Sequence, residues 1–142
     1  MKGYWEAPEA TERCLRPGPL PYERALYTGD LFRADEEGYL YIVGRKDDII
    51  KSRGEKVSPK ELENVLHSLE GVAEAAVIGV PDKILGQAIK AVLVLKAGAN
   101  VTEADVLRHC RQRVEDFAMP KHVVFRSTMP RTSTGKIDKK EL

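Results

Sequence analysis

The segment between Ser58 and Leu69 most limits what this chain can fold into, because it specifies one amphipathic helix. Ser58 is a favourable N-cap, Pro59 suits the first helical position, and Glu61 stands at the capping-box position. Apolar side chains then recur with the i, i+3, i+4, i+7 spacing of a single buried stripe: Leu62, Val65, Leu66 and Leu69. Such a stripe requires an apolar surface on which to pack.

The residues after this helix predict that surface. Gly71 is expected to end the helix, and strands are predicted at residues 72–80 and 88–95. The second strand carries apolar side chains on both faces, which is typical of a strand in the middle of a sheet. A second helix is predicted from Thr102, with Asp105 at its capping-box position. This order predicts an α+β fold, a small antiparallel or mixed sheet flanked by helices.

Shorter strands are predicted on either side of these elements. Residues 26–43 are expected to form two strands around an acidic, glycine-ended turn, and residues 49–57 a hairpin. A last short strand is predicted at residues 123–125. Residues 16–21 contain three prolines and are expected to form an unpaired loop.

Composition excludes several classes of protein. The chain has 142 residues, 32% of them charged, with a net charge of +1, whereas a dedicated nucleic-acid binder is normally clearly basic. No apolar run approaches the ~18 residues of a membrane span, and no signal-peptide core is evident, so we expect a cytoplasmic protein. Two distant cysteines and three scattered histidines show no metal-ligand spacing, so no metal site is predicted.

The segment at residues 130–137 offers one lysine, Lys136, directly after Gly135 in a polar stretch. A phosphate-binding P-loop is excluded, because Pro130 and Ile137 stand where that motif needs glycine and a hydroxyl residue. Lys136 is therefore expected to act as a mobile point charge, delivered to a phosphate by a flexible loop. The lysines that follow it are expected to belong to a solvated tail.

Two upstream residues have the chemistry to bind a nucleotide. Asp30 follows Gly29 at the end of a strand-like segment, where a carboxylate can accept hydrogen bonds from both hydroxyls of a ribose. Arg45 carries a planar guanidinium group that can donate two hydrogen bonds to ribose oxygens or to a phosphate. The alternatives are a turn aspartate for Asp30 and, for Arg45, a salt bridge to Asp47 or Asp48.

Three stretches, at residues 27–31, 44–48 and 130–137, resemble in this order the motifs of the AMP-forming adenylating enzymes. That family includes acyl- and aryl-CoA synthetases, luciferases and peptide-synthetase adenylation domains. The chain resembles the last quarter of such an enzyme. The resemblance implies that residues 1–47 end the large adenylating domain and that residues 48–142 form a mobile C-terminal lid.

The resemblance also implies roles for particular residues. Lys136 is implied as the catalytic lysine of adenylation, Asp30 and Arg45 as ligands of the ribose and phosphate of ATP or AMP, and Asp47 as the hinge. A hairpin is implied to face coenzyme A (CoA) through four residues: Lys51, Arg53, Gly54 and Lys56.

The implied reaction activates a carboxylic acid with ATP as an acyl-adenylate and transfers the acyl group to the CoA thiol. Mg²⁺ is expected to accompany ATP, with its ligand in a preceding N-terminal adenylating domain. The sequence of residues 53–59 resembles acyl-CoA synthetases of fatty acids more than peptide-synthetase modules. Two alternatives remain: an adenylation module that loads a carrier protein, and a stand-alone, non-catalytic lid or interaction module. The isolated chain is expected to be inactive as a ligase.

Overall fold

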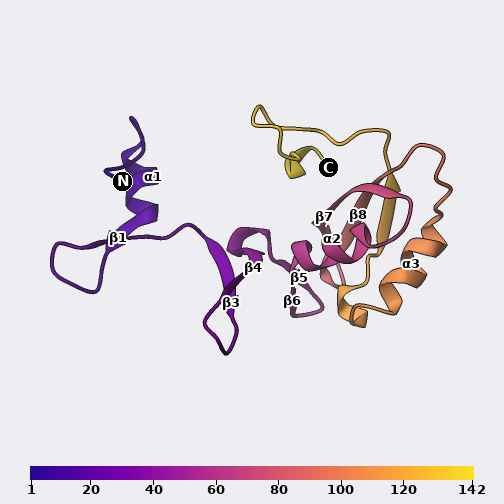
Figure 1. Ribbon diagram of the computed structural model, residues 1–142, viewed down its shortest axis with the longest axis horizontal. Helices are drawn as coiled ribbons and strands as arrows, with labels where there is room; N and C mark the ends of the chain where they lie inside the picture. Colours follow the sequence, from indigo (N-terminus) through magenta and orange to yellow (C-terminus); the bar gives the residue numbers. More distant parts are fainter. The chain divides into compact units, whose positions relative to one another are not determined.

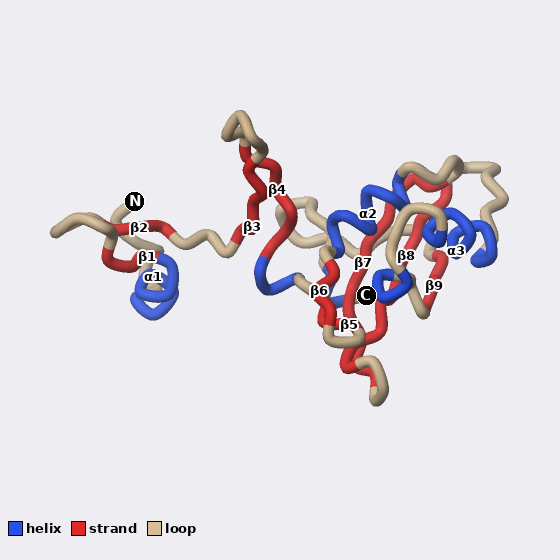
Figure 2. Tube along the Cα trace, turned by 90° about the horizontal axis from the view of Figure 1, so that it is seen from below, coloured by secondary structure: helices blue, strands red, loops and turns tan.

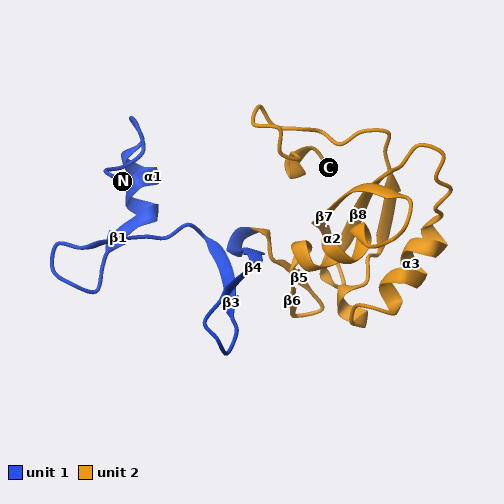
Figure 3. Ribbon diagram, viewed as in Figure 1, with its two compact units in different colours: residues 1–47 blue, residues 48–142 orange.

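A computed structural model describes residues 1–142 (Figure 1). The chain divides into two compact units, residues 1–47 and residues 48–142 (Figure 3). Each unit has its own strands.

Unit 2 (residues 48–142) is built on a five-stranded sheet (Figure 2). Its strands are β5 (Ile50–Ser52), β6 (Glu55–Val57), β7 (Val72–Asp82), β8 (Gly86–Leu95) and β9 (His122–Phe125). The order is β6-β5-β8-β7, and β9 pairs with β8 as well. The β8–β9 pair is parallel and all the others are antiparallel, so the sheet is mixed and the predicted α+β fold is confirmed.

Strand β8 is buried on both faces, as its sequence predicted. Ile89, Ala91 and Leu93 join one core, together with the buried side chains of helices α2 (Pro59–His67) and α3 (Glu103–Arg111). Alternate residues of β8 face a second, smaller core, which includes Met129 from the C-terminal segment. The helices therefore cover one face of the sheet, while the C-terminal segment packs on the other face.

Helix α2 begins as predicted but ends early. Ser58 Oγ accepts the backbone N–H of Glu61 at 3.4 Å, yet the helix stops at His67 and not near Gly71. Ser68 Oγ donates to the carbonyl of Val65 at 2.7 Å, a local bond that competes with continuing the helix. Gly71, with φ of +91°, lies in the turn that leads into β7.

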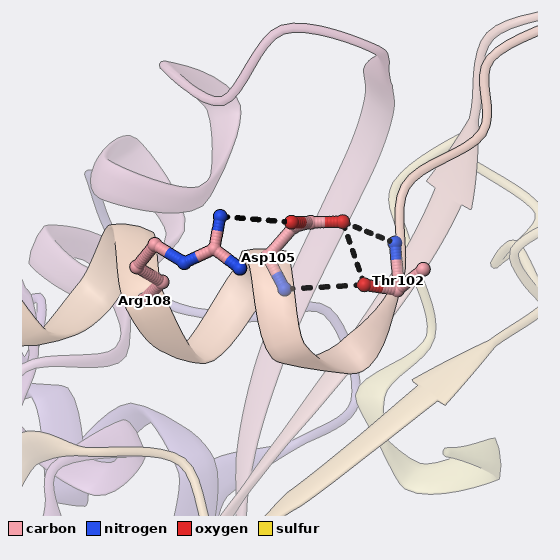
Figure 4. Close-up of polar contacts among 3 residues, drawn as sticks. All are labelled: Thr102, Asp105 and Arg108. Atoms are coloured by element: carbon pink, nitrogen blue, oxygen red, sulfur yellow. Dashed lines mark hydrogen bonds and ion pairs between the residues drawn. The ribbon is translucent and has the colours of Figure 1, made fainter.

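Helix α3 starts at the predicted capping box (Figure 4). Thr102 Oγ1 accepts the N–H of Asp105 at 3.3 Å, and Asp105 Oδ2 accepts the N–H of Thr102 at 3.1 Å. Arg108 adds an ion pair to Asp105 at 3.3 Å. The Thr102 hydroxyl, which donates to the carboxylate, is the main cause that lowers the pKa of Asp105, so this cap remains charged in mild acid.

His109 links the two helices of unit 2 through its ring. Its Nε2 lies 2.9 Å from Ser68 Oγ and 3.0 Å from the carbonyl oxygen of Val65. The ring therefore joins α3 to the C-terminal end of α2, a contact that no spacing rule within one helix could predict.

Unit 1 (residues 1–47) contains one helix and two small hairpins. Its elements are α1 (Pro8–Cys14), β1 (Leu15–Pro17), β2 (Arg24–Leu26), β3 (Asp30–Ala34) and β4 (Leu40–Arg45), and the 3₁₀ turn η1 (Lys46–Asp48) follows. The expectation of an unpaired loop from residue 16 is wrong, because β1 pairs with β2. Pro17 is tolerated at the end of this two-stranded sheet, where a missing N–H costs little.

Strand β4 carries several apolar side chains that are largely exposed. Leu40 and Ile42 are 68% and 58% exposed. Exposed apolar side chains in a row are typical of a surface that another body covers. No helix in either unit is long and apolar enough to cross a membrane.

Candidate functional site

Asp30 and Arg45 lie together in unit 1, at the ends of β3 and β4. They are direct cross-strand partners, and Arg45 Nε lies 3.7 Å from Asp30 Oδ1. Arg45 also donates through an Nη to the carbonyl of Thr28 at 3.1 Å, and Thr28 Oγ1 accepts the N–H of Asp30 at 3.2 Å. The salt bridge of Arg45 is therefore with Asp30, not with the two aspartates that follow it.

A cavity of about 700 Å³ adjoins this pair within unit 1. Its lining includes Asp30, Arg45, Asp47 and the aromatic ring of Tyr27, over which the guanidinium group of Arg16 lies at 4.7 Å. Carboxylate, guanidinium and aromatic groups around one hollow can bind a ligand that has hydroxyl groups, negative charge and a flat ring. Asp47 is the last residue of unit 1 and lies in the exposed turn η1.

The predicted hairpin consists of β5 and β6 in unit 2, with Arg53 and Gly54 at its tip. Both tip residues have positive φ, +55° and +83°, as in the two-residue turns that match strand twist. Nothing lies within 4 Å of where a Cβ on Gly54 would stand, so this glycine makes no close approach within the chain. The N–H of Arg53 donates to the carbonyl of Leu85 at 3.0 Å, which ties the tip to the β7–β8 turn.

Lys51 and Lys56 lie directly opposite each other on this hairpin. Like charges at such a pair of positions destabilise the pairing of two strands. Both side chains are exposed, and neither they nor Arg53 form an ion pair. The hairpin therefore presents three positive charges without ion-pair partners beside the one carboxylate of Glu55, and an anionic ligand could neutralise the excess.

Lys136 lies on a tight hydrogen-bonded turn, not on the loose loop expected. Arg131 and Ile137 form an antiparallel bridge, the N–H of Thr132 donates to the carbonyl of Lys136 at 2.8 Å, and Gly135 has φ of +81°. The side chain of Lys136 is exposed and forms no ion pair and no hydrogen bond. The structure therefore presents a free ammonium group from an ordered backbone.

Two ionic contacts beside Lys136 were not anticipated from the sequence. Lys139 was expected in a solvated tail, but its Nζ lies 2.7 Å from Glu63 Oε1, so that expectation is wrong. Arg131 pairs with Glu74 at 2.6 Å. The acidic partners, Glu63 and Glu74, are far from Lys136 in the sequence, so no local pattern points to them. Only the basic residues stand close enough to Lys136 in the sequence to be recognised as its neighbours.

The structure brings three of the predicted residues together within one unit. Asp30, Arg45 and Asp47 line one cavity of unit 1, whereas Lys136 and the β5–β6 hairpin belong to unit 2. No hydrogen bond or ion pair joins Lys136 to that hairpin. No group of three or more His, Cys, Asp or Glu side chains is arranged to hold a metal ion.

Curated relatives match the whole chain. A long-chain-fatty-acid–CoA ligase of Bacillus subtilis is 41% identical over 142 residues, which is 100% of this chain and 24% of that protein. A crotonobetaine/carnitine–CoA ligase of Salmonella arizonae is 39% identical over the same length, 26% of that protein. The chain thus spans about a quarter of the length of the curated relatives that it matches.

Solved structures share the fold. ATP-bound MatB from Rhodopseudomonas palustris is 39% identical with a TM-score of 0.85, over 99% of this chain and 27% of that one. The amide bond synthetase McbA from Marinactinospora thermotolerans is 35% identical with a TM-score of 0.86, over 99% and 28%. The family described as AMP-binding enzyme C-terminal domain matches residues 61–136, more than half of the 142 residues. The chain therefore belongs to the AMP-binding enzyme C-terminal domain family.

Proposed function

We propose that this chain is the C-terminal part of an ATP-dependent, AMP-forming acid–CoA ligase, with unit 2 as its mobile lid and unit 1 as the end of its large adenylating domain. The observation that carries the proposal is the free ammonium group of Lys136 on an ordered turn. The names of the curated relatives support a CoA ligase. Several of these relatives are named long-chain-fatty-acid–CoA ligases, which supports a long-chain fatty acid as substrate.

Lys136 acts in the first half-reaction. A carboxylate oxygen of the acid attacks the α-phosphorus of ATP, the bond to the β-phosphate oxygen breaks, and pyrophosphate leaves. Negative charge is present on both reacting groups, so an ammonium group between them holds them together and stabilises the transition state. A lysine without an ion pair is suited to this role, because no internal partner has to be displaced.

Asp30 and Arg45 bind the nucleotide in this proposal. The Asp30 carboxylate accepts hydrogen bonds from the ribose hydroxyls, and Arg45 donates to a ribose or phosphate oxygen. Their present contact, at 3.7 Å, is longer than a close hydrogen-bonded ion pair and leaves oxygen and N–H positions of both groups available to a ligand.

The β5–β6 hairpin serves the second half-reaction. The CoA thiol attacks the acyl carbon of the adenylate as a thiolate, and AMP leaves. The charges of Lys51, Arg53 and Lys56 attract the phosphates of CoA, and Gly54 leaves room for its thiol-bearing arm. Mg²⁺ accompanies ATP in this proposal, and its protein ligand is expected in the preceding adenylating domain.

Asp47 is the hinge in this proposal. It is the last residue of unit 1, in the short turn η1, so a change in its backbone angles reorients unit 2. Asp47→Pro would fix φ near −65° and is expected to impair one half-reaction much more than the other. Single-turnover kinetics measures each half-reaction separately. If both proceed at wild-type rates in this variant, Asp47 is not the hinge.

The substitution Lys136→Ala tests the proposal in the longer protein that contains this chain. Adenylation, measured as release of pyrophosphate, is expected to fall by ~10²–10³ because one preorganised electrostatic contact is lost. Transfer from supplied acyl-adenylate to CoA is expected to change little. Lys140→Ala is the matched control, since this neighbouring lysine is exposed and forms no ion pair.

Three outcomes would count against the proposal. Unchanged adenylation in the Lys136 variant would mean that Lys136 is not catalytic, and equal losses in both half-reactions would indicate a role in folding or in both steps. A panel of carboxylic acids, with CoA and a carrier protein as rival acceptors, identifies the substrate. No turnover with any acid would favour the non-catalytic lid or interaction module.

A further inference from the structure

Two ion pairs hold the C-terminal segment on unit 2, and they lie on either side of Lys136 in the sequence. Arg131, five residues before it, pairs with Glu74 of β7 at 2.6 Å, and Lys139, three residues after it, pairs with Glu63 of α2 at 2.7 Å. We call these two contacts the clamp.

The first contact links the sheet directly to the turn that carries Lys136. One Nη of Arg131 donates to Glu74 Oε2 at 2.6 Å, and the other donates to the carbonyl of Gly135 at 2.9 Å. Gly135 immediately precedes Lys136. A single planar guanidinium group therefore fixes the backbone of the turn relative to β7, and a lysine at position 131 could not hold both partners in the same rigid geometry.

The second contact uses a carboxylate that is already fixed. Glu63 is only 9% exposed, and its Oε1 also accepts the N–H of Val77 at 2.9 Å. Strand β7 stands at the end of the sheet order, so this N–H has no strand partner, and Glu63 satisfies it. Lys139 then provides the positive charge that this nearly buried carboxylate needs.

Apolar contacts hold the same segment independently of the clamp. Met129 is buried in the second core, and Ile137 and Leu142 pack against it. Loss of the ion pairs therefore leaves the segment attached and removes only the contacts that set the orientation of the turn. Displacement of a catalytic group by about 1 Å can cost ~10²-fold in rate, so orientation matters for a lysine that must reach two charged groups at once.

We propose that Arg131 and Lys139 are positioning residues that orient the turn carrying Lys136. This inference rests on the proposed function, in which Lys136 acts in adenylation; neither positioning residue touches the substrate. The side chain of Lys136 forms no ion pair or hydrogen bond of its own, so the orientation of the turn sets where its ammonium group lies, and the clamp contributes to that orientation.

The test compares three single variants, Arg131→Ala, Lys139→Ala and Arg131→Lys, with Lys140→Ala as the control of equal charge change. The first readout is amide hydrogen exchange at Thr132, Gly135 and Asp138, whose N–H groups close the turn. Exchange there is expected to rise about 5-fold in Arg131→Ala, whose ion pair lies at the surface, and at least as much in Lys139→Ala, which leaves the nearly buried Glu63 carboxylate without its cation. Amides of β8 report the global fold and are expected to keep their wild-type rates.

The second readout is the split between half-reactions in the longer protein. Adenylation kcat is expected to fall about 10-fold in each alanine variant, with little change in the KM for ATP and in transfer from supplied adenylate. Arg131→Lys is expected to give an intermediate loss, because it keeps the charge opposite Glu74 but not the second hydrogen bond to Gly135.

Each other outcome is decisive. Turn amides that exchange at wild-type rates in both alanine variants would overturn the proposal, and so would adenylation equal to the Lys140 control while Lys136→Ala is impaired. Faster exchange in β8 would show that the two residues serve folding instead. Unchanged adenylation in Lys136→Ala refutes the proposed function, and the exchange experiment still decides whether the clamp orients the turn.

Discussion

Substitution of Gly71 by alanine should destabilise unit 2 through a close approach between two loops. Gly71 has φ of +91°, and an added Cβ would lie 2.9 Å from Val101 Cγ2 and 3.1 Å from the Cβ of Ala99. The carbonyl of Gly71 also accepts the N–H of Lys96 at 2.8 Å, so the turn cannot move away without losing this bond.

The chain provides a matched control at Gly98. Gly98 also has positive φ, +77°, but nothing lies within 4 Å of its added Cβ. Both substitutions incur the left-handed backbone cost of roughly 1–2 kcal/mol, offset by ~0.4–1 kcal/mol from the stiffer unfolded chain. Only Gly71→Ala adds overpacking, which costs about 1–3 kcal/mol. We expect a loss of about 1 kcal/mol at Gly98 and of about 2–4 kcal/mol at Gly71.

Urea unfolding followed through the NMR signals of β8 amides measures this difference within unit 2. With a slope of about 1–1.5 kcal/mol per M, the midpoint of Gly71→Ala should lie ~0.7–3 M below that of Gly98→Ala. Equal midpoints for the two variants would refute the reasoning, because they would show that the contact with Val101 relaxes without cost.

Two further predictions concern titratable groups of known burial. Cys110 is buried, which raises the pKa of its thiol to about 11. A thiol reagent at pH 8 should therefore modify Cys14 first, and Cys110 only when unit 2 unfolds. Mass spectrometry measures the two labelling rates, and equal rates would contradict this prediction. The Lys121 ammonium group, with the N–H groups of the β7–β8 turn, holds the pKa of Asp82 well below its usual range. Because the folded pKa is lower than the unfolded one, Asp82 stabilises unit 2 above about pH 4 and loses this effect as the pH falls further. Asp82→Asn should therefore lower the thermal midpoint at pH 7, and the difference in midpoint between variant and wild type should shrink progressively in acid. A difference in midpoint that stays constant down to pH 3 would show that the Lys121 contact contributes nothing.

Local patterns in the sequence determined most of unit 2. The N-caps Ser58 and Thr102 and the apolar stripe of α2 depend on neighbours within one or two turns of helix, so the residues themselves specify them. The two-faced apolar pattern of β8 likewise predicted its central position, because a strand covered on both faces cannot expose either one. The residues proposed to bind ligands were all named from motifs in the sequence.

Tertiary structure alone decided the contacts between distant segments. The partners Arg131 and Glu74 are 57 residues apart, and His109 reaches back 44 residues to the carbonyl of Val65. The spacing of apolar residues within one helix or strand indicates which face is buried. An ion pair on a half-exposed surface produces no such spacing in the sequence. Its partner is set by how the elements pack, so it becomes visible only when the fold is known.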